Sequence, residues 1–260
     1  MTTHTEYTDG EICRTDLQSS DVESAKAFYA AVFGWHYNDL PAPDGRSCAQ
    51  AFLGDDLVAV IAPQNPQQRS AGVPGQWNVH FASSDAGDLA AGLVHAGGNL
   101  EFGPEPVGGT GVLVLFAPPG GGTTGAWQAG SHIGAALSGE PGSLVWAELL
   151  TPEPQTAVGF FQQLFGHDVT EYPQDDGGRY TTLMVNGAEV AGVAGVPADA
   201  VGTLKPGWQV YFGVSSVAEA VAAAVAAGGT VLIEPDEVEE AGTIATLADP
   251  QGGVFSVLEV

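Results

Sequence analysis

Alternating polar residues on two short β-type stretches carry the side chains best suited to chemistry. Arg14 and Asp16 alternate on the first stretch, and Asn78 and His80 alternate on the second. Because successive side chains of a strand point to opposite faces, each pair shares one face of its strand. Arginine binds planar anions, and a histidine with a carboxylate can transfer protons near neutral pH. We therefore take His80, Asp16 and Arg14 as the catalytic candidates of an anion-binding, acid–base site.

The first of these stretches leads into a helix whose two ends are marked in the sequence. Asp21 can accept hydrogen bonds from the free N–H groups at the helix start, and Gly34 tolerates the positive φ of a helix end. The same strand and helix pattern returns between residues 145 and 167. Corresponding residues are Leu17 and Leu149, Phe28 and Phe160, and Phe33-Gly34 and Phe165-Gly166.

Two further units match each other at a constant spacing of 131 positions, as in the pairs Trp77/Trp208, Phe81/Phe212 and Gly97/Gly228. Agreement at one spacing over a long stretch indicates internal duplication. The chain therefore predicts four strand–helix–three-strand (βαβββ) modules in two tandem domains. The modules are residues 11–63, 75–129, 143–197 and 207–259, and the domains are residues 1–130 and 143–260, with a linker at 131–142.

The helix end FYxxxFGW and the pattern GG…P…G…DPQGG resemble the vicinal oxygen chelate superfamily. That superfamily includes glyoxalase I, bleomycin-resistance proteins and extradiol dioxygenases. The resemblance covers nearly the whole chain, twice, and is strongest to two-domain actinobacterial proteins labelled hydroxylase or glyoxalase-like. It implies an α+β fold in which each domain pairs two βαβββ modules into a curled mixed sheet, a cup with helices outside.

Strand alternation assigns side chains to the two implied cups. The first cup collects Arg14, Asp16, Asn78, His80 and Trp127, and the second collects Trp146, Glu148, Gln209, Tyr211 and Ser256. Cys13, Thr15 and Leu17 are assigned to the helix-facing side. Beside the catalytic candidates, we expect substrate contacts from Asn78, Trp127, Trp146, Glu148, Gln209 and Tyr211. Trp127 would provide an apolar wall. The alternative for Arg14 is an ion pair with Asp16 that only neutralises the cup.

Metal-using members of the superfamily place His, Gln or Glu ligands on the first and last strands of each module. By this resemblance the ligand positions fall on Arg14, Asn78 and Gly125, and on Trp146, Gln209 and Ser256. A cation, an indole, a missing side chain and neutral amides make a poor site for zinc or iron. We therefore expect no metal and no other cofactor. The alternative is one divalent ion in a displaced site built from His80, Asp16 and a third acid.

Composition limits the class of partner. Thirty-one acidic residues against six Lys and Arg give a formal charge of −25, which repels nucleic acid and anionic lipid. No apolar run reaches the length of a membrane span, and no secretory signal is visible at the start. Two cysteines are too few for a disulfide framework, which favours a cytoplasmic location. We expect a small-molecule ligand and a monomer or homodimer.

The sequence thus favours an enzyme of the lyase, isomerase or hydroxylase type. Its substrate would be an organic acid or an oxygen-rich aromatic or polyketide-like molecule, and its chemistry metal-independent acid–base catalysis in the first cup. One alternative is a non-catalytic resistance protein that sequesters a drug or metabolite. Another is a metal-dependent lyase or dioxygenase with a displaced metal site.

Overall fold

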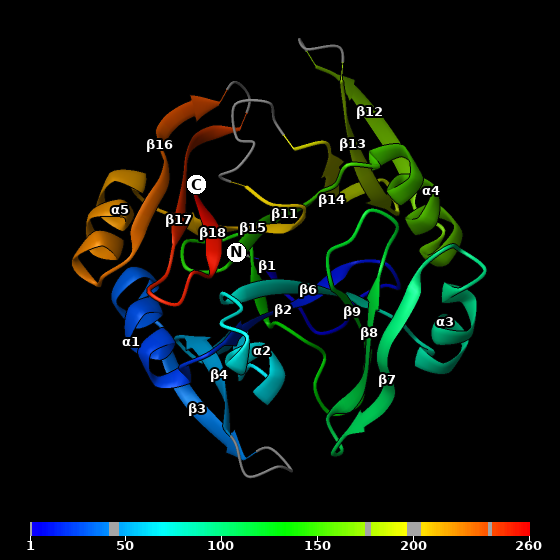
Figure 1. Cartoon of the computed structure of the whole chain (residues 1–260), viewed down its shortest axis with the longest axis horizontal. Coiled ribbons are helices and arrows are strands. Elements are labelled where there is room, and N and C mark those ends of the chain that lie inside the picture. The colour runs from blue at the N-terminus through cyan, green and yellow to red at the C-terminus, as the bar shows by residue number, and fades with distance from the viewer. Residues whose placement is uncertain (1, 42–46, 175–177, 197–203, 239–240) are drawn as a thin grey trace.

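The structure is a computed structural model that describes residues 2–41, 47–174, 178–196, 204–238 and 241–260. Its regular elements follow the predicted order of four βαβββ modules (Figure 1). The third module's expected end at residue 197 lies outside the described residues. Among the residues that are described, no helix is long and apolar enough to cross a membrane.

The first two modules form one sheet. The first module contains β2 (Ile12–Ser19), α1 (Val22–Phe33), β3 (His36–Pro41), β4 (Ser47–Leu53) and β5 (Asp56–Pro63). After the short helix α2 (Pro66–Ser70), the second module contains β6 (Gln76–Ala82), α3 (Ala86–Leu93), β7 (Asn99–Val107), β8 (Gly111–Ala117) and β9 (Thr124–Ala129). The strand order is β3-β4-β5-β2-β6-β9-β8-β7, with β2 and β6 antiparallel at the centre.

The last two modules repeat this arrangement in a second sheet. The third module contains β11 (Leu144–Leu150), α4 (Pro154–Phe165), β12 (Asp168–Pro173), β13 (Arg179–Val185) and β14 (Ala188–Ala194). The fourth contains β15 (Gly207–Val214), α5 (Val217–Ala226), β16 (Thr230–Val238), β17 (Gly242–Ala248) and β18 (Val254–Glu259). The order is β12-β13-β14-β11-β15-β18-β17-β16. A two-stranded ribbon of β1 (Thr2–Thr3) and β10 (Leu137–Ser138) joins the N-terminal segment to the linker.

Helix α1 begins and ends where the sequence predicts. The Asp21 carboxylate accepts the Ser24 backbone N–H at 3.0 Å, and Gly34 has a φ of +73°. The buried face of the helix carries Ala25, Phe28, Tyr29 and Phe33. These side chains give the helix its docking surface, because apolar burial is the main source of stability for a short helix.

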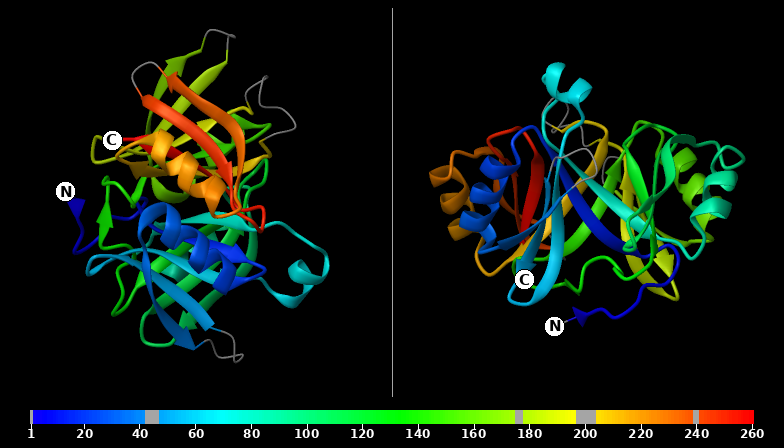
Figure 2. Two further views of the ribbon diagram at one scale, coloured as in Figure 1. Left: turned by 90° about the vertical axis from the view of Figure 1, so that its left-hand side faces the viewer. Right: turned by 90° about the horizontal axis from the view of Figure 1, so that it is seen from below.

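The two domains share one hydrophobic core between their sheets. Helix α1 packs beside α5 on one flank, and α3 packs beside α4 on the other, as the right-hand view of Figure 2 shows. Aromatic contacts cross the boundary, with ring centroids 5.0 Å apart for Trp77–Phe212 and 5.7 Å apart for Phe81–Trp208. Since the helix-facing sides of both sheets enter this core, the opposite, concave sides are left to form the two predicted cups. The predicted fold is confirmed.

Candidate functional site

The centre of the first cup is a two-by-two block of polar residues on paired strands. In the β2–β6 register, Arg14 lies opposite His80 and Asp16 lies opposite Asn78. His80 Nε2 and Asp16 Oδ1 form a short hydrogen bond across the strands. His80 is 1% exposed and Asp16 is 6% exposed, so this pair is shielded from bulk water.

Burial and charge fix the protonation of this pair. Burial, together with the nearby Arg14 cation, lowers the pKa of His80, although the Asp16 carboxylate opposes the shift. Burial alone would raise the pKa of Asp16, but the His80 hydrogen bond and Arg14 hold that pKa below its usual value. At neutral pH the pair is therefore a carboxylate and a neutral imidazole. Because a carboxylate only accepts, the His80 proton lies on Nε2, and Nδ1 keeps a free lone pair.

The missing side chain of Gly125 makes room for the imidazole. Gly125 on β9 lies opposite His80 in the parallel β6–β9 register. A Cβ at this position would overlap His80 Nδ1 and lie 2.5 Å from its Cγ. The ring therefore lies directly over the glycine. A side chain at position 125 would have to push the ring away from Asp16.

Arg14 stacks on an aromatic ring. Its guanidinium carbon lies 5.0 Å from the centroid of the Trp127 ring, a cation–π contact. Trp127 in turn donates its indole N–H to the His132 carbonyl at 2.8 Å. No ion pair forms between Arg14 and Asp16, both of which lie in the described part of the chain. The alternative of a neutralising Arg14–Asp16 pair is therefore wrong. Asp16 bonds His80 and leaves the guanidinium without a carboxylate.

The structure corrects one further expectation near this strand and leaves a second untested. Trp127 is 2% exposed and supports Arg14 from beneath, and its expected contact with a substrate stays a prediction. Cys13 was assigned to the helix side, but it packs with Trp127 and Ala82. The cause is a register shift in β2 between Ile12 and Arg14, which interrupts the strict alternation of side chains.

Three buried side-chain atoms of the first cup have no hydrogen-bond partner. They are Arg14 Nε, Asn78 Nδ2 and His80 Nδ1. Buried polar atoms are almost always paired, and leaving one unpaired costs about 1–3 kcal/mol. Three such atoms on one block of residues indicate a place prepared for a polar ligand.

The second cup brings its predicted residues together in a different way. Tyr211 donates to Glu148 at 2.5 Å, Trp146 donates to the Tyr180 hydroxyl at 2.7 Å, and Gln209 donates to Ser256 at 3.0 Å. Burial raises the pKa of Glu148, although the Tyr211 and Tyr180 hydroxyls oppose the shift. All five residues predicted for this cup thus have partners within the chain.

Sequence reasoning did not find the residue that fills the second cup. Tyr180 on β13 reaches over Gly192 on β14, where a Cβ would overlap the tyrosine hydroxyl and lie 3.0 Å from the Glu148 Cβ. In the first cup the residue in register with Asp16 is Val60, whereas the residue in register with Glu148 is Gly192. A glycine inside a strand often marks such a close approach, and this was the available signal.

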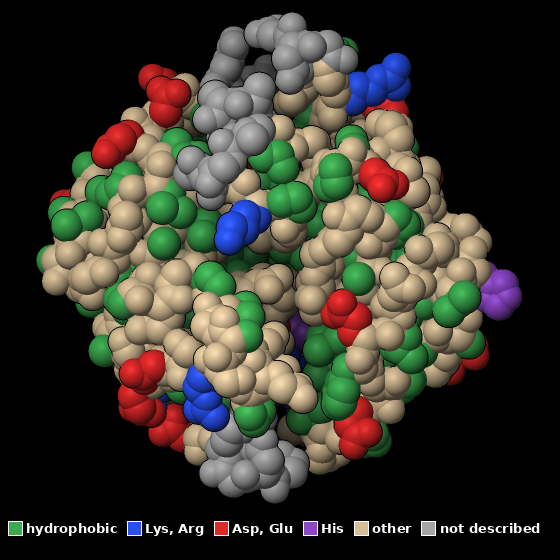
Figure 3. Space-filling model, in the orientation of Figure 1, with side chains coloured by type: hydrophobic (Ala, Val, Ile, Leu, Met, Phe, Trp, Pro, Cys, Tyr) green, Lys and Arg blue, Asp and Glu red, His purple; other side chains and the backbone are tan. Residues whose placement is uncertain are grey.

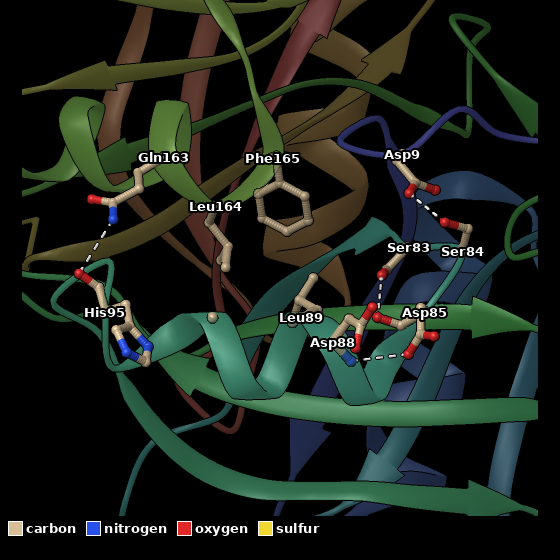
Figure 4. A pocket seen from close by; sticks show the side chains of 11 residues that line it. Asp9, Ser83, Ser84, Asp85, Asp88, Leu89, His95, Gln163, Leu164 and Phe165 are labelled. Atoms are coloured by element: carbon tan, nitrogen blue, oxygen red, sulfur yellow. Dashed lines mark hydrogen bonds between the residues drawn. The ribbon is translucent and has the colours of Figure 1, made fainter.

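Other hollows lie outside this block. A cavity of about 430 Å³ lies between α3 and α4, with Asp9, Asp85 and Asp88 at one end and His95 at the other (Figure 4). Two of these acids are already engaged, since Ser84 donates to Asp9 at 2.6 Å and Asp85 caps α3. A smaller cavity of about 210 Å³ lies beside the N-terminal segment and Trp127. Apart from these two cavities, Figure 3 shows a narrow hollow near the middle of the face in view, with basic and histidine side chains at its bottom.

Comparison with known proteins identifies the family. Residues 11–123 match the family described as "Glyoxalase/Bleomycin resistance protein/Dioxygenase superfamily", and residues 145–258 match "Glyoxalase-like domain". "Putative glyoxylase CFP32" of Mycobacterium tuberculosis is 37% identical over 100% of this chain and 98% of its own length. The chain belongs to the glyoxalase/bleomycin resistance protein/dioxygenase superfamily. "Anthracycline biosynthesis protein DauV" of Streptomyces sp. strain C5 is 33% identical over 98% of this chain and 95% of its own length.

Solved members of the superfamily share the fold. The Mn(II)-bound glyoxalase from Novosphingobium aromaticivorans has a TM-score of 0.65 at 19% identity and covers 96% of this chain and 81% of its own. A variant of homoprotocatechuate 2,3-dioxygenase from B. fuscum has a TM-score of 0.67 at 14% identity, covering 96% of this chain and 71% of its own. At these identities the likeness extends to the fold and not to the site.

The residues of this chain do not fit a divalent metal ion. The row across the first cup is Arg14, His80 and Gly125, and only His80 can serve as a ligand. Its Nε2 is bonded to Asp16, and its ring fills the space over Gly125 where a third ligand's side chain would begin. Within the described ranges no three His, Cys, Asp or Glu residues group as a metal site would require. The third acid of the displaced-site alternative is therefore not among the described residues.

Proposed function

We propose that this protein is a glyoxalase-like enzyme that binds an oxygen-rich organic molecule in the first cup and moves a proton with His80. The observation that carries the proposal is the set of three unpartnered polar atoms on Arg14, Asn78 and His80. Buried donors and acceptors without partners destabilise the folded protein unless a ligand forms hydrogen bonds with them. The neutral imidazole beside an ionised carboxylate is the arrangement of a general base held in one tautomer.

Each residue has one task in the proposed mechanism. Arg14 holds an anionic or partly negative oxygen of the substrate and stabilises charge that develops there. His80 Nδ1 accepts a proton from the bound molecule and returns it at another atom. Asp16 orients the ring through Nε2 and stabilises the imidazolium that forms meanwhile, because the carboxylate stays ionised in the buried pair. No step requires a metal, and the proposal includes none.

The substrate class draws on relatives as well as on the site. DauV and DnrV, each 33% identical to this chain, are both named as anthracycline biosynthesis proteins. Anthracyclines are oxygen-rich polycyclic aromatics, so an aromatic polyketide-like acid or phenol suits both the relatives and the Arg14 cation. The charge of −25 supports a small molecule as the partner, in preference to nucleic acid or a membrane surface, and we place the protein in the cytoplasm.

The polar groups of the second cup bond each other, unlike those of the first cup, and this difference supports the first cup as the functional one. Glu148 and Tyr211 occupy the register positions of Asp16 and His80, but they bond each other, and Tyr180 fills the space beside them. We assign this cup a structural role, because its polar groups are satisfied without a ligand. The substrate contacts expected from Trp146, Glu148, Gln209 and Tyr211 are therefore not part of the proposed site.

Hydrogen exchange on an acidic probe tests the proposal. Phenylpyruvate carries a carboxylate and an acidic C–H, and deuterium uptake from D₂O at that carbon can be followed by NMR. We expect the wild type to accelerate the exchange and His80→Gln to lose at least about 100-fold of that acceleration, the usual weight of a general base. His95→Gln, at an exposed position in the turn after α3, is the matched control. Probe or metabolite that binds in the first cup and is recovered without deuterium would favour the sequestering protein instead.

Metal content tests the metal-free part separately. Protein purified without chelators should hold well under one equivalent of zinc, iron, manganese or nickel. Treatment with a chelator should leave the deuterium exchange unchanged. One equivalent of metal that is lost in the His80→Gln variant would contradict the proposal and restore the displaced-site alternative.

A further inference from the structure

The unpartnered atoms of the first cup specify the ligand more closely than its class. Arg14 Nε and Asn78 Nδ2 carry hydrogens and can only donate, whereas His80 Nδ1 carries a lone pair and can only accept. The β2–β6 register sets Arg14 across from His80, and Asn78 lies two residues before His80 on the same face of β6. The cup therefore offers one donor across the strand pair from the acceptor and a second donor along the same strand as the acceptor.

We infer that the ligand of the first cup is an acid whose carboxylate, or equivalent enolate oxygens, stands next to a carbon or oxygen that bears an acidic hydrogen. The negative oxygens take the hydrogens of Arg14 and Asn78, and the neighbouring hydrogen meets His80 Nδ1. This inference rests on the proposed function for the place of binding, and it adds the order of groups that the ligand must present.

Charge excludes the opposite kind of ligand from this cup. Arg14 remains protonated at any physiological pH, and no acid pairs with it within the described residues. The one acid of the block, Asp16, is already bonded to His80. A cationic drug would face the guanidinium without a free carboxylate. The strongly acidic composition of the chain therefore does not predict a cationic ligand for the first cup.

The proton transfer balances without any co-reactant. The ligand O–H or C–H bond breaks, its electron pair stays on the ligand as a phenolate or enolate, and a new N–H bond forms at His80 Nδ1. Arg14 and Asn78 then hold the oxygen that gains negative charge. Return of the proton to the same atom gives exchange, and return to a neighbouring atom gives an isomer.

A matched set of three small aromatics tests the inference by binding alone. Salicylate has both groups, benzoate lacks the hydroxyl, and phenol lacks the carboxylate. We expect salicylate to bind about 3- to 10-fold more tightly than benzoate, the worth of one neutral hydrogen bond, and phenol to bind weakest. The NMR signals of His80 should shift with salicylate.

Variants show which residue binds the carboxylate of the probe and which binds its hydroxyl. Arg14→Met, which keeps an apolar stem on Trp127, should weaken both acids about 10- to 100-fold and leave phenol unchanged. Arg14→Lys keeps the charge and guards against a folding defect, and Arg179→Gln, an exposed arginine, is the charge control. His80→Gln should remove the advantage of salicylate over benzoate.

Three outcomes overturn the ligand class. They are phenol binding as tightly as the acids, an unchanged salicylate advantage in His80→Gln, and no response of His80 to salicylate. The predicted binding pattern without deuterium exchange on phenylpyruvate would uphold the ligand class while the proposed catalysis fails. Exchange that depends on His80 without the binding pattern would do the reverse.

Discussion

Adding one methyl group at Gly125 should dismantle the first cup. The Cβ of Gly125→Ala would overlap His80 Nδ1, and the backbone of Gly125 is fixed by pairing with His80 on one side and Leu115 on the other. The strand cannot move away, so the ring must leave its place and give up the bond to Asp16. The lost bond joins a carboxylate to a neutral imidazole, and a hydrogen bond to a charged group contributes about 1.5–3 kcal/mol. This is a substantial part of the roughly 5–15 kcal/mol that holds a domain together.

The free energy of unfolding in urea measures this loss. Gly159→Ala in α4 is the matched control, because a Cβ there meets no atom within 4 Å. Since alanine favours a helix over glycine by about 1 kcal/mol, the control should be neutral or stabilising. Gly125→Ala should also abolish the deuterium exchange on phenylpyruvate, while Gly159→Ala keeps it.

The same substitution in a variant that lacks the Asp16–His80 pair tests whether the imidazole causes the loss. With Asp16 and His80 both replaced by alanine, Gly125→Ala has no ring to displace and should cost less than about 1 kcal/mol, so the coupling between the sites should be large. An equal loss of stability in both backgrounds would show that the glycine serves the backbone and not the imidazole.

Three further predictions follow from buried titratable groups. As the pH falls below 6.5, the free energy of unfolding should fall, because His80 takes up a proton in the unfolded chain but resists it when buried. Asp16, whose pKa is lowered in the folded protein, extends this loss to lower pH. If His80→Gln loses stability with falling pH as steeply as the wild type, this prediction is wrong. Burial raises the pKa of Glu148 and favours its uncharged form, so the wild type should lose stability as the pH rises above 4.5. Glu148→Gln should keep the fold and show less of this pH dependence. A destabilisation above about 3 kcal/mol at pH 7 would refute the prediction. Tyr29→Phe should lower the free energy of unfolding in urea by about 1–3 kcal/mol, because the Tyr29 hydroxyl donates to buried Asp249 across the domain boundary at 3.0 Å. An unchanged free energy of unfolding would refute that contact.

The sequence predicted the fold because the modules repeat and their buried elements are strongly patterned. The inner strands and the helix ends, such as Asp21 and Gly34, carry local signals that do not depend on distant contacts. The outer strands β3, β7, β12 and β16 were not located. Strand β7 is exposed along most of its length, and without a buried face a strand loses the alternation that marks it.

The sequence predicted which residues share the first cup, but it did not decide between the possible pairings. Alternation brought Arg14, Asp16, Asn78 and His80 to one face, and their register in the structure agrees. Which groups bond each other depends on side-chain direction across strands. The sequence left two partners open for Asp16, His80 in the acid–base hypothesis and Arg14 in the neutralising alternative, and the structure pairs it with His80. The contact of Arg14 with Trp127 depends on a strand that lies in the other module of the domain, beyond any local pattern.

The tautomer of His80 is the most direct test of the central claim that the first cup holds a ready general base. NMR of the imidazole nitrogens in ¹⁵N-labelled protein at pH 7 should find Nε2 protonated, Nδ1 unprotonated and a pKa below 6.5, with Nδ1 responding when salicylate is added. A proton on Nδ1, or a ring that is already cationic at pH 7, would contradict the account, because neither form can accept a proton from a ligand in this cup.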